Sequence, residues 1–156
     1  MKTQTYDFTA QLRIGQEHER LLDSRLGDLF EIAAATAGEQ RQGIDRHFTH
    51  RKSGAGYLVE YKADSKAGRT NNAFVETVSV DSTGKLGWAF TSRADVLIYL
   101  VTHPETIYCI PLRQLRSQLF RWLWEYPSAQ AQNNGYTTYG ILVPLTEFEA
   151  IASVVY

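Results

Sequence analysis

Apolar and polar positions alternate most clearly at residues 57–63, where the chain reads Tyr-Leu-Val-Glu-Tyr-Lys-Ala. Successive side chains of a β-strand point to opposite faces, so Glu60 and Lys62 share a face with Leu58. The remaining positions, which are aromatic or aliphatic, share the other face. Because both faces carry apolar residues, the pattern predicts an interior strand, where an acid and a lysine are costly unless they have partners.

A second strand is expected to precede this one in a hairpin. Residues 51–56 are charged or small and include two glycines, as is typical of a turn between paired strands. Opposed residues of a hairpin have a nearly constant sum of residue numbers. Asp45 and Glu60 have the same sum as Lys52 and Ser53 in the turn. The sequence therefore predicts that Asp45 lies almost opposite Glu60 on adjacent strands.

Helices are predicted where apolar residues recur at three- and four-residue steps. One such pattern covers residues 16–37 and ends before Gly38, a plausible C-terminal stop. A second covers residues 111–124, with Pro111 in its first turn. A short terminal helix is expected at residues 145–153.

The other apolar runs predict strands separated by polar turns. These strands cover residues 73–80, 95–101, 106–110 and 139–143, and residues 64–72 and 128–135 are predicted to be loops. Strand 73–80 is expected to complete a three-stranded antiparallel meander with the hairpin. The order of elements predicts a single α/β domain over residues 1–156, with a mixed β-sheet flanked by helices on both faces.

The composition is that of a folded globular protein. The chain has 156 residues, of which 44% are hydrophobic and 12% aromatic, enough to bury a core. Its one cysteine, Cys109, lies in an apolar run and is predicted to be a buried strand thiol. No apolar run approaches the ~20 residues that span a bilayer, and no leader pattern is present. A cytoplasmic protein is therefore expected.

The charge of the chain argues against a protein that coats nucleic acid by bulk electrostatics. The net charge is −1, and the isoelectric point is near 6.4. Local cations nevertheless flank the hairpin and could hold phosphates. The candidates for DNA contact are Arg46, Lys52, Lys66 and Arg69. A solvated hairpin face explains the same clustering about as well.

The spacing of the charged residues resembles a known family signature. Asp45, followed by Glu60-x-Lys62 on the next strand, resembles the PD-(D/E)xK motif of the restriction endonuclease-like nuclease superfamily, with Ile44 where the motif loosely keeps a proline. The helix-like stretch that opens at residues 15–19 resembles the resolvase-like and RecB-like branches. The resemblance implies a restriction endonuclease-like fold and a magnesium-dependent endonuclease, a DNA phosphodiesterase.

The resemblance also implies roles for individual residues. Asp45 and Glu60 would bind Mg²⁺ or Mn²⁺ together with the backbone carbonyl of Tyr61. Lys62 would orient the attacking water or neutralise charge on the phosphate in the transition state.

A helix acid would complete the metal site. Glu19 is preferred to Glu17 because it lies at the edge of the apolar stripe of the first helix. An exposed carboxylate near the positive end of the helix dipole is an equally good reading of Glu19.

Other interpretations stay open at this stage. The same fold could form a non-catalytic nucleic-acid-binding or assembly module, or Asp45, Glu60 and Lys62 could be only a structural ion-pair cluster. Glu76 could approach the site, although a solvent-exposed position is favoured. Enzymes that cut both DNA strands generally work as dimers, so a homodimer is expected by analogy.

Overall fold

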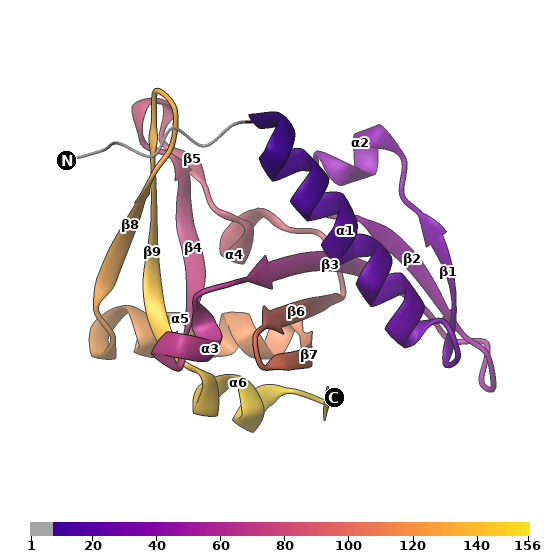
Figure 1. Ribbon diagram of the computed structural model, residues 1–156. Coiled ribbons are helices and arrows are strands. Elements are labelled where there is room, and N and C mark those ends of the chain that lie inside the picture. The colour runs from indigo at the N-terminus through magenta and orange to yellow at the C-terminus, as the bar shows by residue number, and fades with distance from the viewer. Residues whose placement is uncertain (1–7) are drawn as a thin grey trace.

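Two β-sheets form the framework of the protein, as the computed structural model shows for residues 8–156 (Figure 1). The first sheet has six strands in the order β1-β2-β3-β6-β7-β10, and the second has four in the order β5-β4-β9-β8. The β3–β6 pair is parallel and every other strand pair is antiparallel. The predicted α/β class with a mixed sheet is confirmed.

The first sheet is formed by β1 (Phe30–Ala34), β2 (Arg46–His50), β3 (Gly56–Asp64), β6 (Val96–Thr102), β7 (Glu105–Pro111) and β10 (Val154–Val155). The second is formed by β4 (Asn72–Val80), β5 (Lys85–Leu86), β8 (Ser128–Gln132) and β9 (Thr137–Pro144). The helices are α1 (Phe8–Leu26), α2 (Ala37–Gln40), α3 (Ala67–Thr70), α4 (Trp88–Thr91), α5 (Leu112–Glu125) and α6 (Leu145–Ile151), and a 3₁₀ turn covers Asp81–Thr83.

The first sheet is covered on both faces, and the two faces belong to different apolar clusters. Helix α1 lies across one face (Figure 1), where Leu22 and Leu26 pack with Val59, Tyr61 and other apolar residues of the sheet. The opposite face joins a larger core shared with the second sheet, α4, α5 and α6. Helices flank the sheet on both faces, as the sequence predicts.

The predicted helix at residues 16–37 is wrong in its second half. Helix α1 begins earlier, at Phe8, and ends at Leu26, and the chain then forms β1. Strand β1 pairs with β2 along its whole length, from Phe30 opposite His50 to Ala34 opposite Arg46. Pairing with a sheet edge outweighs the helix preference of the alanines here, because tertiary contacts override weak local propensity.

The predicted three-stranded meander is also wrong. Strand β4 leaves the first sheet and pairs with β9 and β5, while β3 pairs with β6. The reason lies in the connection between β3 and β4. There Asp64 accepts hydrogen bonds from the backbone of Lys66 and Ala67 and starts α3, and Asn71 follows with a φ of 56°. This turn redirects the chain and prevents a tight hairpin.

Strand β8, like β1, is an element that the sequence pattern did not reveal. Its residues, Ser-Ala-Gln-Ala-Gln, were predicted to be loop because glutamine and serine carry no strand signal. The strand is an edge strand whose formation depends on pairing with β9. The remaining predicted strands and the helix that begins after Pro111 are confirmed. No helix within residues 8–156 has the length and apolar character needed to cross a membrane.

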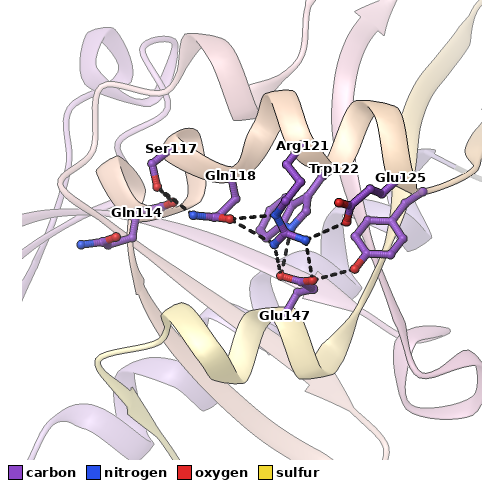
Figure 2. Close-up of polar contacts among 8 residues, drawn as sticks. Gln114, Ser117, Gln118, Arg121, Trp122, Glu125 and Glu147 are labelled. Atoms are coloured by element: carbon purple, nitrogen blue, oxygen red, sulfur yellow. Dashed lines mark hydrogen bonds and ion pairs between the residues drawn. The ribbon is translucent and has the colours of Figure 1, made fainter.

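A half-buried carboxylate, that of Glu147, joins α5 to α6 (Figure 2). Glu147 accepts hydrogen bonds from the guanidinium of Arg121, from Trp122 Nε1 at 3.1 Å and from the Tyr126 hydroxyl at 2.6 Å. Arg121 also pairs with Glu125 at 2.8 Å. The hydrogen bonds from Arg121, with further bonds from Tyr126 and Trp122, lower the pKa of Glu147 to about 2. The cluster fixes α6 against the buried Trp122.

We predict that Glu147→Gln lowers the free energy of unfolding by about 1–3 kcal/mol at pH 7, because three donors lose a charged acceptor. Folding lowers the pKa of Glu147, so its contribution is complete above the ordinary value of 4.5 and is lost as the pH falls toward 2. Urea unfolding at several pH values measures this difference. Glu149→Gln, an exposed change on the same helix, is the matched control. A loss that does not shrink below pH 4 would contradict the assignment.

Candidate functional site

The β2–β3 hairpin brings the two predicted acids together. Arg46 lies opposite Val59 and His47 opposite Leu58, so the observed register is the predicted one. Asp45 directly precedes β2, outside the paired residues, and its charge acts on Glu60. The backbone N–H of Asp45 donates to Val59 O at 2.8 Å, and the Asp45 carboxylate accepts from the Tyr61 N–H at 2.8 Å. The strand therefore holds the Asp45 side chain by its own backbone.

The segment before Asp45 is fixed by burial and by a tight turn. Ile44 is only 4% exposed and lies in the larger core. Gly43 has a φ of 75°, a left-handed conformation that favours glycine, and a Cβ atom there would lie 2.9 Å from Ser92. The Ser92 hydroxyl donates to Gly43 O at 2.9 Å. This contact sets Ser92 beside the hairpin.

Glu60 and Lys62 form an ion pair on the face of β3 that looks toward the second sheet. Lys62 Nζ lies 2.7 Å from Glu60 Oε1. The Glu60 side chain is 3% exposed and that of Lys62 is 35% exposed, with the Lys62 ammonium held against the buried Glu60 carboxylate. The second oxygen of Glu60, Oε2, is buried and has no hydrogen-bond partner among the described residues. A buried carboxylate oxygen without a partner is costly, and a water, a cation or the nearby Ser92 hydroxyl would satisfy it.

Burial and neighbouring charges shift the pKa values of both residues upward. Burial raises the pKa of Glu60, and the Asp45 carboxylate adds to the rise, although Lys62 and Ser92 oppose it. Burial lowers the pKa of Lys62, but the carboxylates of Glu60, Asp45 and Glu76 outweigh it, and the net shift is upward. The rise keeps the Lys62 ammonium charged, whereas the rise at Glu60 favours its neutral acid form.

Glu76 reaches this site from the second sheet. It is half-buried on β4, and its carboxylate acts on Lys62. A Cβ atom at Gly87 would lie 2.4 Å from Glu76 O and 2.7 Å from its Cγ, so the start of α4 packs directly on Glu76. The end of α4 is capped by Ser92. Glu76 is thus half-buried and not at a fully exposed strand end, and the sequence alone gave only its face on the strand.

Glu19 does not join Asp45, Glu60 and Lys62. Its carboxylate pairs with Arg46 at 2.8 Å on the α1 side of the sheet. Arg46 also contacts Asp23 at 3.1 Å, and Asp23 accepts from the Tyr61 hydroxyl at 2.8 Å. Tyr61 precedes Lys62 and follows Glu60, so strand alternation points its ring to the opposite face. Glu19 therefore does not converge with the motif residues as predicted. It lies instead with Asp23, which the sequence analysis did not single out, and both pair with Arg46.

The predicted DNA contacts separate into one buried and three exposed residues. Arg46 is 11% exposed at its side chain and is neutralised by Glu19 and Asp23, so it is not free to hold phosphate. Lys52, Lys66 and Arg69 are exposed and form no ion pair among the described residues. Lys52 lies in the turn before β3, whereas Lys66 and Arg69 follow β3 at α3. Lys52 therefore lies at one end of β3, and Lys66 and Arg69 lie at the other.

The groups that could hold a cation are Asp45, Glu60 and the Tyr61 carbonyl. The N–H and C=O of one strand residue point to the same side of the strand, and the Tyr61 N–H bonds Asp45. The Tyr61 carbonyl therefore points toward Asp45 as well. No group of three or more His, Cys, Asp or Glu side chains that could hold a metal occurs in the described part of the chain. Two carboxylates and a carbonyl suit Mg²⁺, which keeps several waters, and the unpartnered Glu60 Oε2 fits such an ion.

Comparisons with known proteins found no relative, so any functional conclusion depends on the geometry of the site. No protein-family model, curated protein or solved structure matches the chain. The resemblance to the PD-(D/E)xK signature rests on the chain's own Asp45, Glu60 and Lys62.

We predict that Lys62→Met lowers the free energy of unfolding by about 1–3 kcal/mol at pH 8 in EDTA, because Glu60 loses the one cationic partner it has among residues 8–156. An acid whose pKa is raised by folding opposes stability above its ordinary pKa, and more so as the pH rises. The loss should therefore shrink as the pH falls to 5, because the raised pKa of Glu60 lets it take up a proton at a higher pH than an ordinary glutamate. Urea unfolding at the two pH values checks this.

The double variant Lys62→Met with Glu60→Gln is the control for this prediction. It removes the buried charge together with its partner, so most of the pH 8 loss should be recovered. A double variant as unstable as Lys62→Met alone would mean that Lys62 acts by packing.

Proposed function

We propose that this protein is a magnesium- or manganese-dependent phosphodiesterase that acts on DNA, of the PD-(D/E)xK type. One observation carries the proposal. The Asp45 carboxylate is held by the Tyr61 N–H next to Glu60, Lys62 pairs with Glu60, and Glu60 keeps one buried oxygen without a partner among the described residues. The resemblance expects this arrangement of two acids and a lysine. An intracellular DNA substrate agrees with the expected cytoplasmic location.

The residues would divide the chemistry in the following way. Asp45, Glu60 and the Tyr61 carbonyl would hold the cation, which when bound polarises a phosphoryl oxygen and lowers the pKa of a nearby water. Asp45 is kept in place by the Tyr61 N–H, so it needs no rearrangement to serve as a ligand. The Lys62 ammonium would donate hydrogen bonds to the phosphate and stabilise the negative charge that grows in the transition state.

The surroundings of the site support this division. Glu60 is nearly excluded from water, and electrostatic interactions are stronger where water is excluded. Lys62 is about one-third exposed and marks the side from which substrate could approach. Lys66 and Arg69 follow β3 directly and are free to contact the DNA backbone near that opening, with Lys52 at the far end of the strand.

A non-catalytic assembly role is the second candidate, and one feature of α5 favours it. Phe120, Leu123 and Trp124 are 82%, 44% and 88% exposed, on the side away from the buried Trp122. Exposed apolar groups of this kind often mark contacts between proteins. The same surface could serve a homodimeric nuclease, so the two candidates differ only in whether the chain cuts DNA.

We predict that Asp45→Asn abolishes the rise in melting temperature that Mg²⁺ or Mn²⁺ produces, and lowers the DNA cleavage rate by at least about 10²-fold. The variant removes one of two ligand carboxylates but keeps the acceptor for the Tyr61 N–H. Cleavage is measured on linear, nicked, branched and single-stranded DNA, and melting with and without the cation.

Asp28→Asn, an exposed change in the loop after α1, is the matched control and should keep both properties. Wild-type protein that is unaffected by either cation and cuts none of the four substrates would refute the proposal. DNA binding without cleavage would favour the assembly role.

A further inference from the structure

Strand β8 leaves one edge of the second sheet open. It is the outermost strand of that sheet, next to β9, and follows the end of α5 (Figure 1). It pairs with β9 without a shift in register, and all of its residues are exposed or half-buried. Because an edge strand has a neighbour on one side only, every second residue presents its backbone N–H and C=O to the outside.

Two hydrogen bonds show which residues of β8 face β9. The Leu142 N–H donates to Pro127 O at 3.0 Å, and the Asn133 N–H donates to Tyr136 O at 2.9 Å. Hydrogen-bonded and non-hydrogen-bonded pairs alternate along an antiparallel ladder. The backbone groups of the odd-numbered residues of β8 therefore point toward β9.

The even-numbered residues of β8 form the open edge. Ser128, Gln130 and Gln132 point their backbone N–H and C=O away from β9, because each lies between two residues that bond it. No bond from these outward groups to another of residues 8–156 is present. The edge thus offers a regular row of donors and acceptors to a further strand.

The segment around this edge carries no charge. Residues 126–146 include no Asp, Glu, Lys, Arg or His. Natural sheet edges are commonly guarded against pairing by a charge, a bulge or a very short strand. Strands β5 and β10, the outer strands elsewhere, have two residues each, and β1 carries the exposed Glu31. Strand β8 has none of these guards.

We propose that β8 is a homodimer interface, at which two copies of the chain pair their β8 strands antiparallel about Gln130. In a twofold dimer a residue at the axis meets its own copy, so a charge there would be repelled. A neutral edge therefore suits a second copy of the same chain. The pairing joins two four-stranded sheets into one continuous sheet.

The register of this pairing follows from the outward groups. Gln130 lies opposite the partner's Gln130, and Ser128 lies opposite the partner's Gln132. Both kinds of pair consist of outward-facing residues, so each pair exchanges two hydrogen bonds, about six in the whole contact. Between them Ala129 meets the partner's Ala131, and these small side chains do not clash.

The end of α5 adds apolar area to the contact. Phe120 and Trp124 are strongly exposed, and Trp124 lies shortly before the start of β8 in the chain. Antiparallel pairing sets the start of β8 beside the partner's β8–β9 turn, where the partner's Tyr136 is also exposed. Trp124 would cover that turn, and aromatic residues are enriched at protein interfaces. This area matters because a single pair of short strands buries less surface than stable dimers usually need.

Sedimentation velocity over a range of protein concentrations, in EDTA and without DNA, measures the dimer. We expect the wild type to dimerise and Gln130→Pro to weaken the dimer at least about tenfold. Proline removes the outward N–H of residue 130 but no bond to β9, and edge strands tolerate proline at such positions. The variant should therefore melt within a few degrees of the wild type.

Charge exchange at Gln130 tests the register. Gln130→Lys and Gln130→Glu each set like charges against each other across the axis, so each variant alone should dimerise at least about tenfold more weakly than the wild type. A mixture of the two should recover a heterodimer, because the introduced ammonium then meets the introduced carboxylate. Gln114→Lys and Gln114→Glu, the same changes at an exposed position of α5, are the matched controls and should leave dimerisation unchanged.

Three results would overturn the proposal. The first is a wild type that stays monomeric at every concentration, including one in which slow hydrogen exchange at Gln130 shows that another segment of the chain covers the edge. The second is a dimer that none of the Gln130 variants weakens, because another surface must then form it. The third is weakening by both charge variants without recovery in their mixture. If Gln130→Pro does not fold, the charge exchange decides alone.

The inference goes beyond the proposed function and does not depend on it. Neither the cation nor DNA is present in the sedimentation experiments, so their outcome leaves the nuclease proposal untouched. A protein that pairs through β8 and cuts no DNA would support the interface and remove the nuclease proposal.

Discussion

The alternation of side chains along β3 is the constraint on which the rest of the structure depends. Val59 and Tyr61 point to α1 and form part of one core, and Glu60 and Lys62 point to the second sheet. Side chains alternate between the two faces of a strand, so a shift that moved Glu60 and Lys62 to the α1 face would move Val59 and Tyr61 to the opposite one. The same alternation holds the Tyr61 hydroxyl on Asp23 and separates the α1 acids from the candidate site.

Burial of Glu60 is difficult to explain as a means of stabilising the fold. Taking a carboxylate and an ammonium out of water costs several kcal/mol, and an apolar pair of similar volume is often as stable or more so. Here the pair is incomplete, since one oxygen of Glu60 has no partner. Strongly shifted acids in partly open, charged surroundings are concentrated at functional sites. The cost of burying Glu60 and the resemblance to the motif therefore both single out Glu60 and Lys62.

Local patterns in the sequence were sufficient for the parts of the structure that depend on neighbouring residues. The register of the paired hairpin residues followed from the turn. Asp45 lies just before the paired residues and bonds to Val59 and Tyr61. Strand β1, the pairing of β4 and the existence of β8 depend on distant partners, so no local period revealed them. Glu19 was misplaced because helix periodicity cannot tell which face of a sheet the helix will cover. Glu76 was missed because its approach depends on how two sheets pack.

The number of residues in the turn between β2 and β3 sets the register of the two strands. Only Gly54, with a φ of 73°, has a backbone conformation there that restricts the residue type. One residue more or fewer in the turn would shift β2 against β3 and turn the side chains of one strand to the other face. We therefore expect a change in the length of this turn to disturb the site more than a substitution at one of its exposed positions.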